Sequence, residues 1–245
     1  MRLKIFFSII LLSFIAACGS KKKPEIDASF HFANAIKNIK AGNLNSAQDA
    51  LDKIETDFPY SDYSVKAELL IAFIHYLKGD YADSIVAAEK FIKLRPANPE
   101  VDYMYFMRAE SFFQSRSDFL REQDTSIKAQ NNFKQLLTRF PGSKYNGYSN
   151  DKLKILAKEI AHYNLQIALT HQNRKEYIPA LRRLKFIAAN FPDSIYLSET
   201  YFRMVEIYYS LGLKEQATAI SKQLAEQNKK DFWSKQNQKF IAKYL

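Results

Sequence analysis

A six-residue phrase, Phe-Pro-x-Ser-x-Tyr, occurs three times in this chain of 245 residues. Its copies occupy Phe58–Tyr63, Phe140–Tyr145 and Phe191–Tyr196, and each follows a strongly amphipathic stretch with the period of an α-helix. A phrase that recurs at a fixed distance from a helix end indicates that one helix-turn-helix element is stacked several times, because such an element cannot bury its apolar face alone. The sequence therefore predicts a repeat array, with its function on a surface that several repeats share.

Glycine, small residues and proline mark the same positions in successive repeats. Pro59 and Pro96 lie 37 residues apart and stop the second helix of a pair. Glycine permits a positive φ at the turn within a pair, and a small residue lets the two helices approach closely. These positions are Gly42 with Ala47, and Gly79 with Ser84. The pattern resembles the tetratricopeptide repeat. Because no strand-period stretch competes with it, the expected fold is all-α: a right-handed superhelix of about five tetratricopeptide-like helix pairs.

The expected domain organisation follows from this alignment. A repeat domain covers residues 26–245, and its third repeat holds a polar insertion near Ser117–Thr125. The fourth repeat begins with an unusually long helix, from about Asn150 to Gln172. The five repeats are expected at about 28–61, 65–98, 101–143, 149–194 and 197–230.

The first seventeen residues have the composition of a signal peptide. Basic residues precede an apolar run, Ile5–Ile15, that is too short for a helix to cross a bilayer about 30 Å thick. The sequence Ile15-Ala16-Ala17-Cys18 resembles the bacterial lipobox, in which the cysteine thiol takes a diacylglyceryl group. Residues 1–17 are therefore expected to be removed and Cys18 to be lipidated, the alternative being a free or buried thiol. Several acyl chains would hold the protein firmly on a membrane.

The residues after Cys18 predict where the anchor lies. Position 19 is Gly rather than Asp, which resembles the outer-membrane class of bacterial lipoproteins. We therefore expect a lipid-anchored protein on the periplasmic face of the outer membrane. Residues 18–25 read as a polar tether, whose three lysines, Lys21–Lys23, would either touch anionic headgroups or remain solvated.

Charge and motifs exclude several functional classes. The formal net charge of +10 is spread along the chain, and an exported lipoprotein rarely meets nucleic acid, so acidic proteins or anionic lipids are the expected partners. The four histidines have no cysteine partners and no i, i+4 pairing, so no metal site is expected. No nucleophile elbow, Walker loop or dinucleotide fingerprint occurs. The chain is predicted to be a non-enzyme without a cofactor, apart from the covalent lipid on Cys18.

Two sets of residues are candidates for partner binding. In tetratricopeptide arrays the first helices line a groove, and aromatic side chains at the groove-facing positions can hold an extended peptide. The alternative is that these rings pack the core between helices. The groove candidates are Phe32, Ile36, Leu69, Phe73, Tyr76, Tyr103, Phe106 and Phe113.

The second set is a pair of adjacent arginines. Arg182 and Arg183 lie on the second helix of the fourth repeat, so at least one of them must face outward. Such a charge is either simply solvated or a partner anchor, since a guanidinium pairs bidentately with a carboxylate.

Taken together, these features resemble the BamD family of outer-membrane barrel-assembly lipoproteins. The resemblance rests on the lipobox, the five repeats, the three phrases and the segment Pro99–Arg108, in which Asp102, Tyr103, Met107 and Arg108 match the family pattern. It implies a scaffold that docks the POTRA domains of the barrel protein BamA and helps recognise unfolded outer-membrane proteins. The family arginine that pairs with an acidic residue of BamA falls on Arg183. BamC and BamE are further family partners that vary between lineages.

Two other functions are weaker alternatives. One is an outer-membrane tetratricopeptide adaptor for cell-wall or division proteins, which would use the same groove for another peptide; the match over Pro99–Arg108 argues against it. The other is a cell-wall hydrolase, but the available length holds no separate catalytic domain. The lysine-rich C-terminal tail departs from the family pattern and leaves its contacts open.

Overall fold

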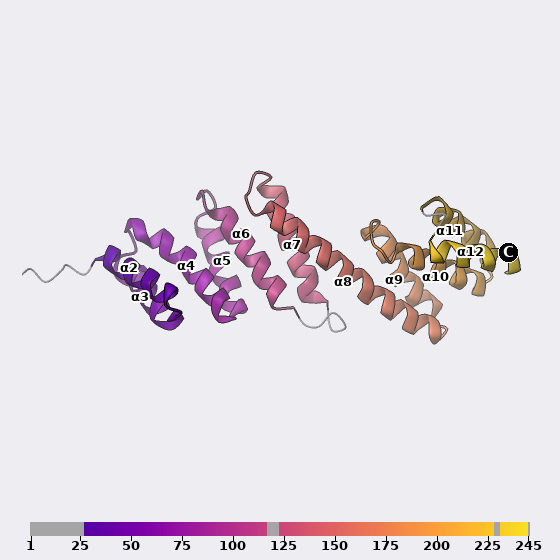
Figure 1. The fold of residues 1–245 in the computed structure, drawn as a ribbon, viewed down its shortest axis with the longest axis horizontal. Coiled ribbons are helices and arrows are strands. Elements are labelled where there is room, and N and C mark those ends of the chain that lie inside the picture. Colours follow the sequence, from indigo (N-terminus) through magenta and orange to yellow (C-terminus); the bar gives the residue numbers. More distant parts are fainter. Residues whose placement is uncertain (1–26, 117–122, 228–230, 245) are drawn as a thin grey trace, which may run out of the picture. The chain divides into compact units, whose positions relative to one another are not determined.

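The computed structural model describes residues 27–116, 123–227 and 231–244 (Figure 1). Within these ranges the chain forms helices and turns and no strand, so the predicted all-α fold is confirmed. The predicted signal peptide, Cys18 and the predicted tether lie outside the described residues, as does most of the predicted insertion in the third repeat. The chain divides into two compact bodies, Met1–Ala67 and Glu68–Leu245.

The helices follow one another in pairs. The N-terminal body contains α2 (Ala28–Lys40), which packs on α3 (Leu44–Asp57), and the first residues of α4 (Asp62–Lys78). The C-terminal body contains the rest of α4 and the helices α5 (Tyr81–Leu94), α6 (Val101–Gln114), α7 (Asp124–Arg139), α8 (Asn146–Asn173), α9 (Tyr177–Asn190), α10 (Leu197–Ser210), α11 (Lys214–Gln227) and α12 (Phe232–Tyr244).

The turn within a pair has one recurring geometry. Gly42, Gly79 and Gly212 have φ values of 77°, 81° and 75°, a conformation that costs glycine nothing. The backbone N–H groups of the glycine and of the next residue then bond to carbonyls of the preceding helix, as in a Schellman motif. In the fourth pair Lys175 takes this position, with φ 60°.

The Phe-Pro-x-Ser-x-Tyr phrase forms the turn between pairs. In all three copies the serine N–H donates to the phenylalanine carbonyl at 3.0 Å, and the serine carbonyl accepts from the N–H three residues later. In the second and third copies the serine hydroxyl also accepts from the tyrosine N–H, at 3.3 and 3.2 Å. The phrase therefore recurs because one pair of consecutive turns joins each helix pair to the next.

Side chains of the segment Pro99–Arg108, at the start of the third pair, bond to α7 and to the turn that follows α7. The Asp102 carboxylate accepts from the Ser143 hydroxyl at 2.7 Å, and the Arg108 guanidinium donates to the side-chain oxygen of Gln135 on α7. Met107 is 2% exposed. These residues of the family pattern hold α6 against α7 and against the turn that follows α7.

Small residues occupy the close-packing positions, as expected. Ala47, Ser84, Ala129, Ala180 and Ala217 are all 0% exposed. In the C-terminal body the helix contacts run between consecutive helices from α5 to α12, and α12 also packs on α10. The predicted long helix is α8, which lies between α7 and α9 (Figure 1). None of the described helices combines the length and the apolar character that a bilayer crossing requires.

Candidate functional site

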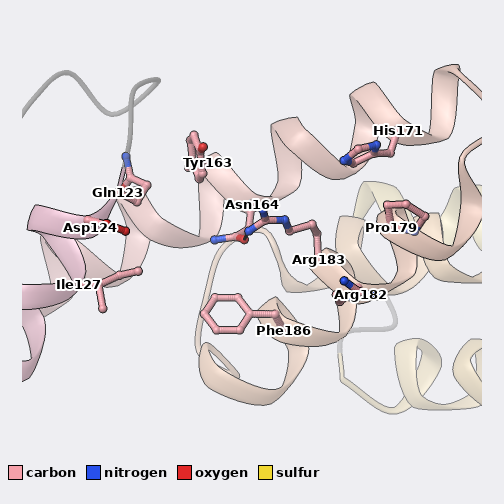
Figure 2. Close-up of a pocket in the computed structure, with 10 residues that line it drawn as sticks. All are labelled: Gln123, Asp124, Ile127, Tyr163, Asn164, His171, Pro179, Arg182, Arg183 and Phe186. Carbon is pink, nitrogen blue, oxygen red and sulfur yellow. Dashed lines mark hydrogen bonds between the residues drawn. The ribbon is translucent and has the colours of Figure 1, made fainter.

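Arg182 and Arg183 line a cleft of about 590 Å³ in the C-terminal body (Figure 2). We call it the arginine cleft. Its walls come from the beginning of α7, the second half of α8 and the first half of α9, so three helices from two repeats build it. The lining residues are Gln123, Asp124, Ile127, Tyr163, Asn164, His171, Pro179, Arg182, Arg183 and Phe186.

A buried asparagine orients Arg183. Asn164, on α8, is 4% exposed, and its side-chain N–H donates to the Ile160 carbonyl at 2.8 Å. This bond fixes the amide so that its oxygen accepts from Nη1 of Arg183 at 3.1 Å. One edge of the guanidinium is thereby held, and its other N–H groups remain available to a ligand.

Unlike Arg95 and Arg203 of the same body, the two arginines have no carboxylate partner among the described residues. Arg95 pairs with Glu68 at 2.7 Å, and Arg203 pairs with both Glu199 and Glu206. No ion pair among the described residues involves Arg182 or Arg183, and both side chains are exposed. The cleft thus presents two guanidinium groups that form no ion pair among the described residues, and one carboxylate, Asp124, in its lining.

Apolar side chains surround these charges. Phe186 is 39% exposed and Ile127 is 38% exposed, and both point into the cleft region in Figure 2. Phe186 is held at its edge by Phe191, with ring centroids 5.8 Å apart. An arginine beside exposed rings is the composition typical of an interface hot spot, because the apolar rim limits the access of water to the ion pair.

A carboxylate and an imidazole also line the arginine cleft. Asp124 lies in the first turn of α7, where the helix dipole stabilises a carboxylate. His171 contacts the Glu176 carboxylate through Nδ1 at 2.6 Å, so its ring is held at the cleft edge by the fold. The arrangement suits an acidic, partly apolar protein surface.

The predicted groove residues fall in both bodies. In the N-terminal body Phe32 and Ile36 are half-buried, and the Phe32 ring lies 5.1 Å from that of Tyr63. In the C-terminal body, five candidates are half-buried: Leu69, Phe73 and Tyr76 of α4, and Tyr103 and Phe106 of α6. Half-buried rings of this kind both pack on neighbours and leave a face for a ligand.

Phe113 differs from the other groove candidates. It is 7% exposed and packs edge-to-face against Phe133 of α7, within the main core of the C-terminal body. Its ring belongs to the packing between the helices of the third pair. Of the two interpretations of these aromatics, the core one describes Phe113 best.

Sequence reasoning missed a buried carboxylate on the same helix face. Glu110 of α6 is 3% exposed and accepts hydrogen bonds from the hydroxyls of Tyr76 on α4, at 3.2 Å, and Tyr148 on α8, at 3.0 Å. Burial, followed by the Glu110 charge, raises the pKa of each tyrosine to about 12. One carboxylate therefore joins the first helices of three successive repeats.

A histidine and two aspartates also converge at the turn between α4 and α5. His75, Asp80 and Asp83 offer ligand atoms within 4.8 Å of one another. Both aspartates are exposed, and Asp80 contacts the Lys78 ammonium at 3.5 Å. The sequence pattern did not reveal this group, because its members are joined by a turn rather than by a helical i, i+4 spacing.

Three comparisons relate the chain to known proteins. The sequence model of the YfiO family, described as outer membrane lipoprotein, matches residues 24–224. Proteins named outer membrane protein assembly factor BamD are similar over most of their length. One from Rickettsia prowazekii is 25% identical and covers 98% of both chains, and one from Vibrio cholerae is 25% identical over 93% of this chain and 99% of its own. One from Caulobacter vibrioides is 26% identical over 86% of this chain and 71% of its own.

Among solved structures, a thermophilic TPR protein of Thermus thermophilus is 15% identical, with a TM-score of 0.39, and covers 88% of this chain and 100% of its own. A tetratricopeptide repeat protein from Parabacteroides merdae is 14% identical, with a TM-score of 0.40, over 82% of this chain and 80% of its own.

Proposed function

The chain belongs to the YfiO family of outer membrane lipoproteins, and from this we propose that it is a scaffold of the β-barrel assembly machinery. Its relatives bear the name outer membrane protein assembly factor, which describes a binding role rather than a reaction. We propose that the protein is anchored to the periplasmic face of the outer membrane by lipid on Cys18. In this role it needs no cofactor and performs no catalysis.

We propose that the arginine cleft docks the POTRA region of the barrel protein BamA. The observation that carries this proposal is the exposed guanidinium of Arg183, held by buried Asn164 and without a carboxylate partner of its own. A carboxylate of the partner would complete it with bidentate hydrogen bonds, and Phe186 and Ile127 would exclude water around the pair. BamC and BamE, which the family resemblance gives as partners that vary between lineages, are proposed as further partners of this scaffold.

The aromatic faces of the first helices are proposed to receive unfolded outer-membrane proteins. Rings such as Tyr103 and Phe106 supply contact area at a small entropic cost, and such a face accepts many sequences. In this proposal BamA binds at the arginine cleft, and unfolded substrates bind at the aromatic faces of the first helices.

The test combines an exchange of charge with crosslinking in cell envelopes. Arg183→Glu should lower the amount of BamA that co-purifies with the lipoprotein by about tenfold or more, because the variant places two acidic groups against each other. The matched control is Arg174→Glu, an equal change of charge at an exposed residue that does not line the cleft. Arg183→Glu also removes the hydrogen bond to buried Asn164, so circular dichroism melts are used to check that this variant stays folded at the temperature of the binding assay.

A photo-crosslinking residue at position 183 identifies what the cleft contacts, and one at position 106 does so for the aromatic face. Capture of BamA from 183 and of unfolded barrel proteins from 106 is the expected result. Reproducible capture of a cell-wall or division enzyme from both positions would replace the proposed function by that of an adaptor.

A further inference from the structure

A second cleft, of about 490 Å³, lies between the same three helices. We call it the lysine cleft. Its walls come from the middle of α7, the first half of α8 and the turn after α9, which is the third copy of the repeated phrase. The residues that line it include Lys134, Leu153, Lys154, Lys158, Phe191 and Ile195.

The lysine cleft and the arginine cleft follow one another along α8. The arginine cleft uses Asn164 on α8 and Arg183 on α9, and the lysine cleft uses Lys154 on α8 and Asn190 on α9. Ten helical residues separate Asn164 from Lys154, which corresponds to about 15 Å along the helix axis. An extended segment of about five residues spans that distance.

The positive charges of the lysine cleft are largely uncommitted. Lys134 and Lys158 are exposed, and no ion pair among the described residues involves them. Lys154 contacts Asp151 at 2.9 Å, but both side chains are more than 70% exposed, and a pair of this kind exchanges readily with a better partner. Asp193 is the acidic residue in the lining, so the cleft carries an excess of positive charge.

The lining of the lysine cleft includes an exposed apolar residue that the repeat does not require. Ile195 is 73% exposed. The other two copies of the phrase have Asp62 and Lys144 at this position, so the turn forms equally well with a charged residue there. Leu153, which is half-buried, and Phe191, which is buried, are further apolar residues of the lining. The lining therefore combines an exposed apolar side chain with three lysines, which suits a partner with both apolar and acidic side chains.

We propose that the lysine cleft is the second half of the docking site, and that it binds an acidic and apolar segment of the same protein whose carboxylate reaches Arg183. This inference rests on the proposed function of the arginine cleft. The segment lies extended along α8, with one acidic residue at Arg183, an apolar residue on Ile195, and a second acidic residue between Lys154 and Lys158. Two charged ends fix its direction and its register.

The test measures the affinity of the purified POTRA region of BamA from the same organism for the full-length, lipid-free chain. Two variants probe the lysine cleft: the double change Lys154→Glu with Lys158→Glu, and the single change Ile195→Asp. Each should raise the Kd by about tenfold or more, and the double change should also flatten the dependence of Kd on salt. The control is Lys222→Glu with Lys239→Glu, an equal change of charge at exposed residues of α11 and α12, which should change Kd less than twofold.

The outcomes separate this inference from the proposed function. If Arg183→Glu weakens binding and both lysine-cleft variants bind like wild type, the second half of the site is wrong and the arginine cleft stands. If Arg183→Glu binds like wild type, the proposed docking face fails, and the inference fails with it. Melting curves of Ile195→Asp show whether a loss of affinity comes from unfolding, which the high exposure of this side chain makes unexpected.

Discussion

Lys175 occupies the left-handed position that glycine takes in three other helix pairs. Its φ of 60° puts the lysine Cβ close to the following carbonyl, and this costs an L-residue about 1–2 kcal/mol. The turn keeps its usual hydrogen bonds, since the Lys175 and Glu176 N–H groups donate to the Gln172 and His171 carbonyls. The surrounding helices therefore impose the conformation on the residue.

Lys175→Gly should stabilise the C-terminal body. The change removes the left-handed strain, but glycine also makes the unfolded chain more flexible, so the expected gain is about 0.5–1 kcal/mol. Urea unfolding followed by circular dichroism measures it. Lys175→Ala serves as the comparison, because alanine keeps the strain and should show no gain. A lower stability of the glycine variant would mean that the lysine side chain makes a contact stronger than the strain.

Single residues also show which parts of the candidate site the sequence could reveal. Arg182 and Arg183 were identified because two adjacent charges on an amphipathic helix cannot both be buried. Asn164 was not, because an asparagine within an apolar stripe signals a buried polar group but not its partner, which comes from the next helix. Glu110 was missed for the same reason, since its tyrosine partners lie 34 and 38 residues away in the chain.

The serine hydroxyl of the repeated phrase makes different contacts in different copies. In the second copy the Ser143 hydroxyl donates to the Asp102 carboxylate at the start of α6, at 2.7 Å. In the first copy the hydroxyl oxygen of Ser61 is buried and has no hydrogen-bond partner among the residues that the structure describes. The same residue type thus stabilises one turn and leaves a polar group unsatisfied in the other.

Ser143→Ala should therefore destabilise the protein by about 1.5 kcal/mol, because it removes a hydrogen bond to a charged group. Ser61→Ala should change the free energy of unfolding by less than about 0.5 kcal/mol, or raise it, because no bond is lost. Thermal and urea unfolding of the two variants, side by side, measure the difference. Equal losses would show that the serine contributes through the backbone of the turn and not through its hydroxyl.

The helices themselves were the most predictable elements. The long helix expected from about residue 150 to 172 is α8, Asn146–Asn173, because a 3.6-residue apolar period continues through that stretch without an interrupting proline. The arginine and lysine clefts were not predictable in this way. They depend on how α7 and α9 are placed on α8, which is set by side-chain packing between residues far apart in the chain.

At the scale of the whole molecule, the proposed lipid anchor at Cys18 would place the docking surfaces of the repeat domain next to the membrane. Cys18 is the only cysteine in the chain, so no other thiol can take its lipid. The described helices contain no membrane-spanning candidate. Attachment through one modified residue would leave the repeat array free to present its surfaces to partners near the membrane.

Cys18→Ala should abolish labelling of the protein by radioactive fatty acid and shift it from the outer-membrane fraction to a soluble or unprocessed form. The repeat domain should keep its helical circular dichroism spectrum, because Cys18 precedes the first described helix. Retention of the label and of membrane association in this variant would exclude lipidation at Cys18. Binding of the POTRA region in solution should be unchanged, which separates anchoring from docking.

The repeated phrase also bears on how the surface of such a protein can change over time. Its phenylalanine, proline, serine and tyrosine are constant, whereas its third and fifth positions carry Tyr60 and Asp62, Gly142 and Lys144, and Asp193 and Ile195, all of them exposed. The backbone bonds of the turn are alike in all three copies. Substitutions at these two positions can therefore alter the recognition chemistry at each junction while the scaffold stays folded, much as variable loops do on a constant framework.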